Sequence, residues 1–165
     1  VVTFKGAYGH RWSVRKYREI LPEADNLPRE QQRQWIYFGM FPNFVLGLYP
    51  DSVIYYQEVP QSAEQTVQRG MCYRRRDESR EMRAARYLSG RIDRDTAEED
   101  HMLMVWSCEA TKSSAYDGVI FSDLEYGVKT YHDHLRQLLP VMAQPIPPES
   151  GQMALLNDAL LSKGD

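Results

Sequence analysis

Hydrophobic and polar positions divide the chain into a strand-rich middle and a helical later part. Between residues 34 and 60 aromatic and β-branched residues are dense, and proline-containing steps interrupt them. This pattern predicts strands near 34–40, 43–49 and 52–59. A fourth strand is expected in EQTVQRGMCYRR, residues 64–75. The connections are too short for crossover helices, so we expect an antiparallel sheet.

Helical periodicity begins after these strands. The stretch from Asp77 predicts a helix that ends at Gly90 as its C-cap, and a second helix is expected over about 96–111. A third helix is predicted from Ser122 or Asp123 to Leu139, with Glu125 as a capping partner. Its apolar stripe covers four turns, enough to pack across a curved sheet.

The two ends of the chain differ from its centre. Residues 1–33 are polar and interrupted by glycine and proline, so they predict an irregular segment with one short helix near 12–21. Residues 143–165 combine a proline-rich linker with a short amphipathic helix. The expected organisation is therefore 1–33, a central domain over 34–142, and 143–165.

The amino-acid composition limits the classes of function that the chain can have. The 165 residues are 42% hydrophobic and 26% charged, as expected for one globular domain. The formal net charge of −3, with basic residues matched by acids, gives no reason to expect a nucleic-acid partner. No long apolar stretch or export signal is visible, so we expect no membrane association and a cytoplasmic location. Cys72 and Cys108 are expected to be buried free thiols.

Three consecutive carboxylates, Glu98, Glu99 and Asp100, head an apolar run at 102–106. Glu98 and Glu99 fit a capping box with Asp95 or Thr96 as N-cap, and they complement the helix dipole. Asp100 lies past the free backbone donors. Because the following run is apolar on nearly every side, the pattern predicts a buried helix and a buried carboxylate.

A buried Asp100 requires compensation by a basic side chain, a metal ion or a hydrogen-bond donor. A buried ion pair and a metal or catalytic role both remain open at this point. His101 cannot easily share an ion with Asp100, because adjacent helical residues point about 100° apart. The chain contains no nucleophile elbow, phosphate loop, zinc-binding helix or dinucleotide fingerprint.

The order of these segments resembles the C-terminal part of the catalytic domain of Rieske-type non-haem iron oxygenases, the ring-hydroxylating oxygenase α subunits. WIYFGMFPNFVLGLYPDSVIYYQEVP looks like the family's aromatic-rich strand, Pro-Asn turn and Pro-Asp hairpin. EQTVQRGMCYRR is similar to the strand that follows. EEDHMLMVWSCEATKSSAYDGVIFSDLEYGVKTYHDHL is similar to the acidic pair, apolar helix, Ser-rich loop and closing helix. The match covers residues 34–140.

The resemblance implies an α+β helix-grip (Bet v1/START-like) fold, in which an antiparallel sheet packs against a long C-terminal helix. It implies that Asp100 is the carboxylate of a two-His-one-carboxylate Fe(II) site, which leaves iron positions open for dioxygen. Electrons would come from NAD(P)H through a reductase or ferredoxin and a Rieske [2Fe-2S] cluster. The expected reaction is hydroxylation or demethylation of a small organic substrate, with an aromatic substrate as one option, as in aromatic compound catabolism.

The expected substrate cavity is lined by Phe44, Leu46, Tyr55 and Met104, for which plain core packing is the alternative interpretation. Val105 and Cys108 stand where relatives often place Glu and Gln. By resemblance, the protein is expected to be a homo-oligomer, a trimer.

The family's cluster motif and its two-histidine segment do not occur in this sequence, which begins Val1-Val2-Thr3. We therefore expect an incomplete domain, with both histidine ligands and the cluster upstream, and no activity from these 165 residues alone. Two other functions remain open. One is a non-catalytic helix-grip module that binds an apolar small molecule. The other is a partner-binding or oligomerisation domain whose last helix docks on a neighbour.

Overall fold

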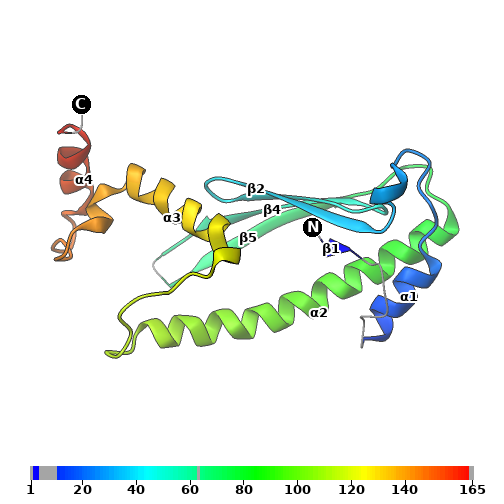
Figure 1. Ribbon diagram of the computed structural model, residues 1–165, viewed down its shortest axis with the longest axis horizontal. Coiled ribbons are helices and arrows are strands. Elements are labelled where there is room, and N and C mark those ends of the chain that lie inside the picture. Colours follow the sequence, from blue (N-terminus) through cyan, green and yellow to red (C-terminus); the bar gives the residue numbers. More distant parts are fainter. Residues whose placement is uncertain (1, 4–10, 63, 164–165) are drawn as a thin grey trace. The chain divides into compact units, whose positions relative to one another are not determined.

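The computed structural model describes residues 2–3, 11–62 and 64–163 (Figure 1). The chain forms two compact units, Val1–Tyr116 and Asp117–Asp165. The boundary lies within the segment that the sequence assigns to the central domain; the predicted division into 1–33, 34–142 and 143–165 stays a prediction. Each unit is described separately.

The first unit contains an antiparallel sheet with the strand order β1-β2-β3-β4-β5. The strands are β1 (Val2–Thr3), β2 (Gln34–Met40), β3 (Phe44–Leu48), β4 (Val53–Pro60) and β5 (Thr66–Tyr73). Every neighbouring pair is antiparallel. The four strands expected from the sequence are confirmed to within about two residues at each end, whereas β1 was not predicted.

The turn between β3 and β4 is the Pro50-Asp51 hairpin expected from the sequence. The Tyr49 backbone N–H donates to the Ser52 carbonyl at 2.9 Å and closes the turn. Proline suits this position because it presets the first turn torsion. Asp51 has a further role, because its side chain is buried and faces the helical layer.

One long helix, α2 (Arg80–Thr111), replaces the two helices predicted over 77–90 and 96–111. Its N-cap is Ser79, whose hydroxyl accepts from the Met82 N–H at 3.1 Å. Gly90 lies inside the helix and is not a C-cap, since its φ is not positive. The buried positions Ala85, Leu88, Ser89 and Ile92 continue with helical spacing across Gly90. Burial of this stripe outweighs the cost of one helical glycine, about 1 kcal/mol.

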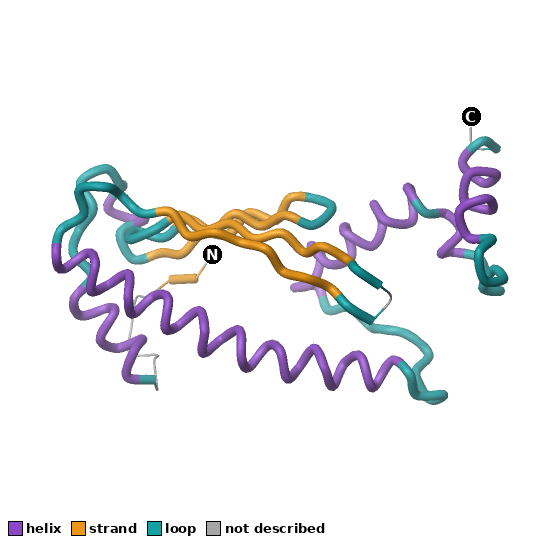
Figure 2. Tube along the Cα trace, turned by 180° about the vertical axis from the view of Figure 1, so that it is seen from behind, coloured by secondary structure: helices purple, strands orange, loops and turns teal. Residues whose placement is uncertain are grey.

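The core joins α2 to the sheet and to α1 (Trp12–Ile20), which packs along α2 (Figure 2). The short helix expected near 12–21 is thus confirmed. The core residues come from all three parts of the unit: Tyr17, Leu21, Trp35, Tyr49, Ala85, Leu88 and Ile92. The sheet therefore rests on the N-terminal half of α2.

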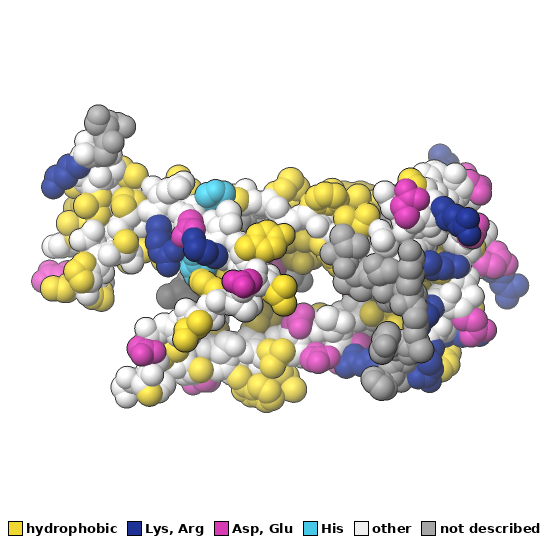
Figure 3. All heavy atoms as spheres, in the orientation of Figure 1, with side chains coloured by type: hydrophobic (Ala, Val, Ile, Leu, Met, Phe, Trp, Pro, Cys, Tyr) yellow, Lys and Arg dark blue, Asp and Glu magenta, His cyan; other side chains and the backbone are white. Residues whose placement is uncertain are grey.

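The C-terminal half of α2 is exposed, contrary to the buried helix predicted there. The exposed fractions in the apolar run lie between 47% and 61% for Met102, Leu103, Met104, Val105 and Trp106. The sheet and α2 diverge toward this end (Figure 1), and Figure 3 shows hydrophobic side chains along it. Cys72 and Cys108 are free thiols, as expected, but both are exposed, so their predicted burial is wrong.

The second unit consists of α3 (Tyr126–Leu138), α4 (Met153–Leu161) and two 3₁₀ helices, Asp123–Glu125 and Pro140–Ala143. The predicted capping partner is confirmed, because the Ser122 N–H donates to Glu125 Oε2 at 2.7 Å. The Asn157 amide joins α4 to the preceding segment by donating to the Leu138 carbonyl at 3.1 Å.

The α+β class with an antiparallel sheet is confirmed, and the helix that shares the sheet's core is α2. Within the described residues, no helix combines the length and apolar character needed to cross a membrane.

Candidate functional site

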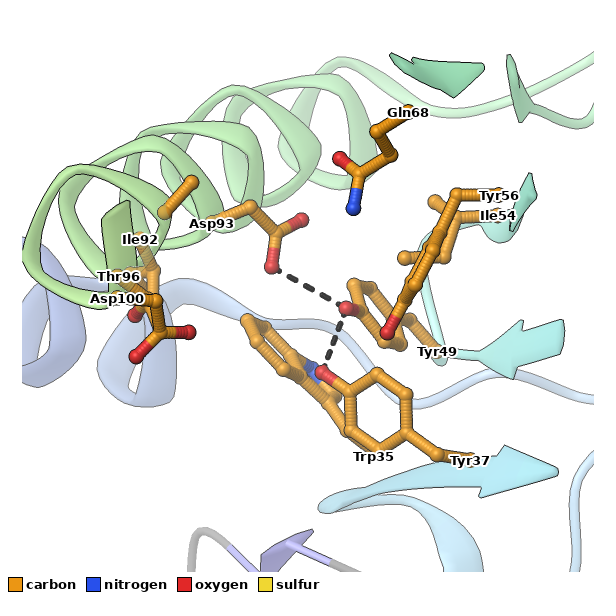
Figure 4. Close-up of a pocket in the computed structure, with 11 residues that line it drawn as sticks. Trp35, Tyr37, Tyr49, Ile54, Tyr56, Gln68, Ile92, Asp93, Thr96 and Asp100 are labelled. Carbon is orange, nitrogen blue, oxygen red and sulfur yellow. Dashed lines mark hydrogen bonds between the residues drawn. The ribbon is translucent and has the colours of Figure 1, made fainter. Parts of the chain in front are cut away.

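A pocket of about 630 Å³ lies where α2 faces the sheet (Figure 4). This volume is within the range of small-molecule sites, roughly 300–1,000 Å³. Five residues of α2 and six from the sheet side line the pocket: Ile92, Asp93, Thr96, Ala97 and Asp100, and Trp35, Tyr37, Tyr49, Ile54, Tyr56 and Gln68.

The sheet side follows from the alternation of side chains along strands. Trp35 and Tyr37 are two positions apart on β2, so their side chains share one face, and Ile54 and Tyr56 do the same on β4. Gly47 of β3 pairs with both Tyr37 and Ile54. A Cβ at Gly47 would lie 2.6 Å from Ile54 Cγ1, so the absence of a side chain lets the flanking side chains fill this position.

The α2 side follows from helical spacing. Asp93, Thr96 or Ala97, and Asp100 recur at i, i+3 or i+4, and i+7, which places them on one face of the helix. Figure 4 shows the Asp93 carboxylate directed at the tyrosines of the sheet. Asp93 and Asp100 are two turns, roughly 10 Å, apart along the axis.

A chain of hydrogen bonds links Tyr37, Tyr49 and Asp93. The Tyr49 hydroxyl donates to Asp93 Oδ1 at 3.1 Å, and the Tyr37 and Tyr49 hydroxyl oxygens are 2.7 Å apart. Because Tyr49 has one hydroxyl hydrogen and gives it to Asp93, Tyr37 is the donor to Tyr49. Both hydroxyl hydrogens are thus committed within the chain.

Burial perturbs the acidity of all three groups. It raises the pKa of the Asp93 carboxyl to about 6, with a smaller contribution from the charge of Asp51 and opposed by the Tyr49 hydrogen bond. Burial also raises the pKa of Tyr49 and of Tyr37 above their ordinary values. A carboxyl with a pKa so near neutrality, inside a pocket, is typical of functional sites.

A further carboxylate, the buried Asp51, belongs to a hydrogen-bond network next to the pocket. It accepts from the Tyr17 hydroxyl at 2.5 Å and from the Ser89 hydroxyl at 2.6 Å. The Trp35 indole N–H donates to the Tyr17 hydroxyl at 3.1 Å, and the Trp35 ring stacks on Tyr49 at 4.0 Å. This network fixes the two aromatic rings at the pocket floor.

Asp100 lines the pocket, but it is exposed and not the buried carboxylate expected from the sequence. Asp95 and Thr96 lie inside α2, so the predicted capping box with Glu98 or Glu99 is also wrong. Glu99 instead accepts a charged hydrogen bond from Arg11 at 3.1 Å. The capping box was predicted wrongly because a helix was expected to begin at 96, whereas α2 begins sixteen residues earlier.

Phe44, Leu46, Tyr55 and Met104 do not line this pocket. Leu46 and Tyr55 pair across β3 and β4, next to the Gly47–Ile54 pair, so their side chains point to the opposite face of the sheet. The Phe44 and Tyr55 rings stack on that face with centroids 5.5 Å apart. Met104 is 58% exposed on α2.

Asp93, Tyr37 and Tyr49 were not singled out from the sequence. For Asp93 the available pattern is its spacing of four and eight residues from the buried Ser89 and Ala85, which has meaning only in a helix that is continuous through Gly90.

The residues present do not form a complete metal site. Among residues 2–3, 11–62 and 64–163, no three or more His, Cys, Asp or Glu side chains come together to hold a metal ion. Asp100 would supply one carboxylate at the pocket, and no described histidine joins it.

The chain is similar to a known protein family. The model of the family described as ring hydroxylating alpha subunit (catalytic domain) matches residues 5–140. No curated protein and no solved structure matches the chain.

Proposed function

The chain belongs to the ring-hydroxylating α-subunit catalytic-domain family, and we propose that it is part of a Rieske non-haem iron oxygenase that hydroxylates or demethylates a small organic substrate. The family match over 5–140 is the observation that carries this proposal. The oxidant is O₂, and the electrons come from NAD(P)H through a reductase or ferredoxin and a [2Fe-2S] cluster. The enzyme acts in the cytoplasm as a homo-oligomer.

Asp100 is the proposed iron carboxylate of this chain. Its place in the pocket lining, on the same face of α2 as Asp93, supports this role, because a metal ion held there would border the space open to a substrate. The two histidine ligands and the cluster are proposed to come from outside these 165 residues, because the family's two-histidine segment and cluster motif do not occur in this sequence.

Phe44, Leu46 and Tyr55 contact substrate only if the second face of the sheet also borders a cavity in the complete oxygenase. Met104, on α2, contacts substrate only if a cavity also forms beside the exposed part of that helix. The pocket residues Tyr37, Tyr56 and Asp93 are better supported, because they line a defined volume.

The proposal is tested first on the 165-residue chain. We expect it to bind no stoichiometric iron and to give no product with NAD(P)H and a reductase, because it contributes one ligand at most. Stoichiometric iron or turnover from this chain alone would contradict the proposal.

A non-catalytic module that binds a small molecule is the second candidate. The observation in its favour is a pocket of ligand size without a gathered metal-ligand set in the described residues. It predicts that a longer protein containing this chain also purifies without mononuclear iron, whereas the oxygenase proposal predicts the opposite.

A further inference from the structure

The pocket carries negative charge that no basic side chain balances. Asp93 and Asp100 are its charged lining residues, and no Lys, Arg or His is among the lining residues. Within the described part of the chain, no ion pair joins either carboxylate to a basic group. Burial and the charges of Glu58, Asp100 and Asp93 raise the pKa of Tyr56, in keeping with a negative potential here.

The polar atoms that face the pocket are mostly hydrogen-bond acceptors. The hydroxyl hydrogens of Tyr37 and Tyr49 are committed to the chain that ends at Asp93. Gln68 Nε2 donates one of its two hydrogens to Glu58 Oε1 at 2.7 Å, and the Gln68 carbonyl oxygen is a further acceptor. Asp93 Oδ2 receives no hydrogen bond from the described residues. This carboxylate oxygen is therefore available to accept a hydrogen bond from a donor that the ligand brings.

The walls are apolar and aromatic. Tyr37, Ile54 and Tyr56 are partly exposed around the pocket, over the buried pair Trp35 and Tyr49. Aromatic rings favour both an apolar body and a nearby cation, because the negative face of each ring attracts positive charge. Acceptors, negative charge and aromatic walls together suit one class of ligand.

We propose that this pocket binds a small organic amine in its protonated form, with the ammonium N–H groups donating to Asp93 and the apolar or aromatic body lying between Tyr37 and Tyr56. Asp93 provides the charge, Tyr37 provides a hydroxyl lone pair, and Tyr49 fixes the orientation of the Asp93 carboxylate.

The assignment of this amine as the substrate rests on the proposed function. Because Asp100 lies about 10 Å from Asp93 along α2, the amine and the part of the ligand nearest Asp100 are different ends of the molecule. An anionic aromatic acid is disfavoured, since its carboxylate would meet unpaired acceptors of the same sign.

Calorimetric titration of the 165-residue chain tests the proposal without any metal. The probes are benzylamine, benzyl alcohol and benzoate at pH 7.5, which share one ring and differ in charge. We expect benzylamine to bind at least about tenfold more tightly than benzyl alcohol, and benzoate not to bind. Equal binding of the three probes, preference for benzoate, or no binding of benzylamine would overturn the proposal.

Two variants locate the site. Asp93→Asn should lower the affinity for benzylamine at least about tenfold and leave that for benzyl alcohol unchanged. Glu98→Gln removes a carboxylate of α2 that does not line the pocket, and should change neither affinity. Unchanged benzylamine affinity in Asp93→Asn would also overturn the proposal. A negative result in these binding experiments would not contradict the iron proposal, because the iron proposal is tested by Asp100 variants and by iron content.

Discussion

The Tyr49 hydroxyl donates to the Asp93 carboxylate at 3.1 Å, and this bond joins the end of β3 to the middle of α2. It places a titratable group between a buried aromatic pair and an open pocket. The bond partly offsets the burial that raises the pKa of Asp93 to about 6. The consequences for stability and for ligand binding can be measured separately.

Asp93 makes stability depend on pH in a defined window. Its pKa is about 6 in the folded protein and 3.8 ordinarily, so the folded state holds the proton more tightly. The contribution of Asp93 to the free energy of unfolding is greatest below about pH 4 and is lost as the pH rises to about 6. Asp93→Asn keeps an acceptor for Tyr49 and removes the charge.

We expect Asp93→Asn to match the wild type near pH 4 and to exceed its free energy of unfolding by roughly 1–2 kcal/mol above pH 6, a value reduced for partial exposure. Urea unfolding between pH 4 and 8 measures this difference. A difference that does not vary with pH would show that Asp93 is not the group responsible.

Gly47 tests how closely the pocket wall is packed. A Cβ at this position would lie 2.6 Å from Ile54 Cγ1 and 3.4 Å from Tyr37 Cε1. Gly47→Ala should therefore lower the free energy of unfolding by about 1–3 kcal/mol. Gly39→Ala is the control, because nothing lies within 4 Å of its Cβ position. Equal effects of the two substitutions in urea unfolding would contradict this packing.

Asp51 tests the buried network behind the pocket. Asp51→Ala removes the acceptor of the Tyr17 and Ser89 hydroxyls, so we expect a loss of about 3 kcal/mol or more in the free energy of unfolding. Asp77→Ala, at a side chain that is 80% exposed, should change it by less than about 0.5 kcal/mol. A small effect of Asp51→Ala would mean that the network contributes little.

Gly90 tests the continuity of α2. Within a helix interior, Gly90→Ala should raise the free energy of unfolding by about 0.5–1 kcal/mol, since nothing lies within 4 Å of its Cβ position. At a left-handed C-cap the same substitution would be destabilising. Gly118→Ala provides that comparison, because Gly118 has a φ of +135° and should lose stability. Destabilisation by Gly90→Ala would contradict a continuous helix.

The strands were predictable because their signals are local. Aromatic and β-branched alternation, the Pro50-Asp51 turn and short connections are all visible within ten residues, and so is the capping pair of Ser122 and Glu125. The start of α2 was partly visible, but its continuation through Gly90 was not. That depends on burial of Leu88 and Ile92 against a sheet distant in sequence.

The candidate site was predictable only in part for the same reason. Asp100 was singled out because it precedes an apolar run and stands in a family motif; it lines a pocket in the structure, and its role as a ligand stays a prediction. Asp93 carries no local signal, because its burial and its bond to Tyr49 arise from the packing of α2 on the sheet. The lining guesses on β3 and β4 fell on the second face, since alternation gives two faces without saying which one meets the helix.

We propose that Asp100 is the iron carboxylate, and the iron content of a purified oxygenase that contains this chain is the decisive measurement. We expect Asp100→Ala to lose the mononuclear iron while the visible absorption of the [2Fe-2S] cluster is unchanged, and Glu99→Gln, at the neighbour paired with Arg11, to retain both. An Asp100→Ala protein that keeps its mononuclear iron and its activity would contradict the claim.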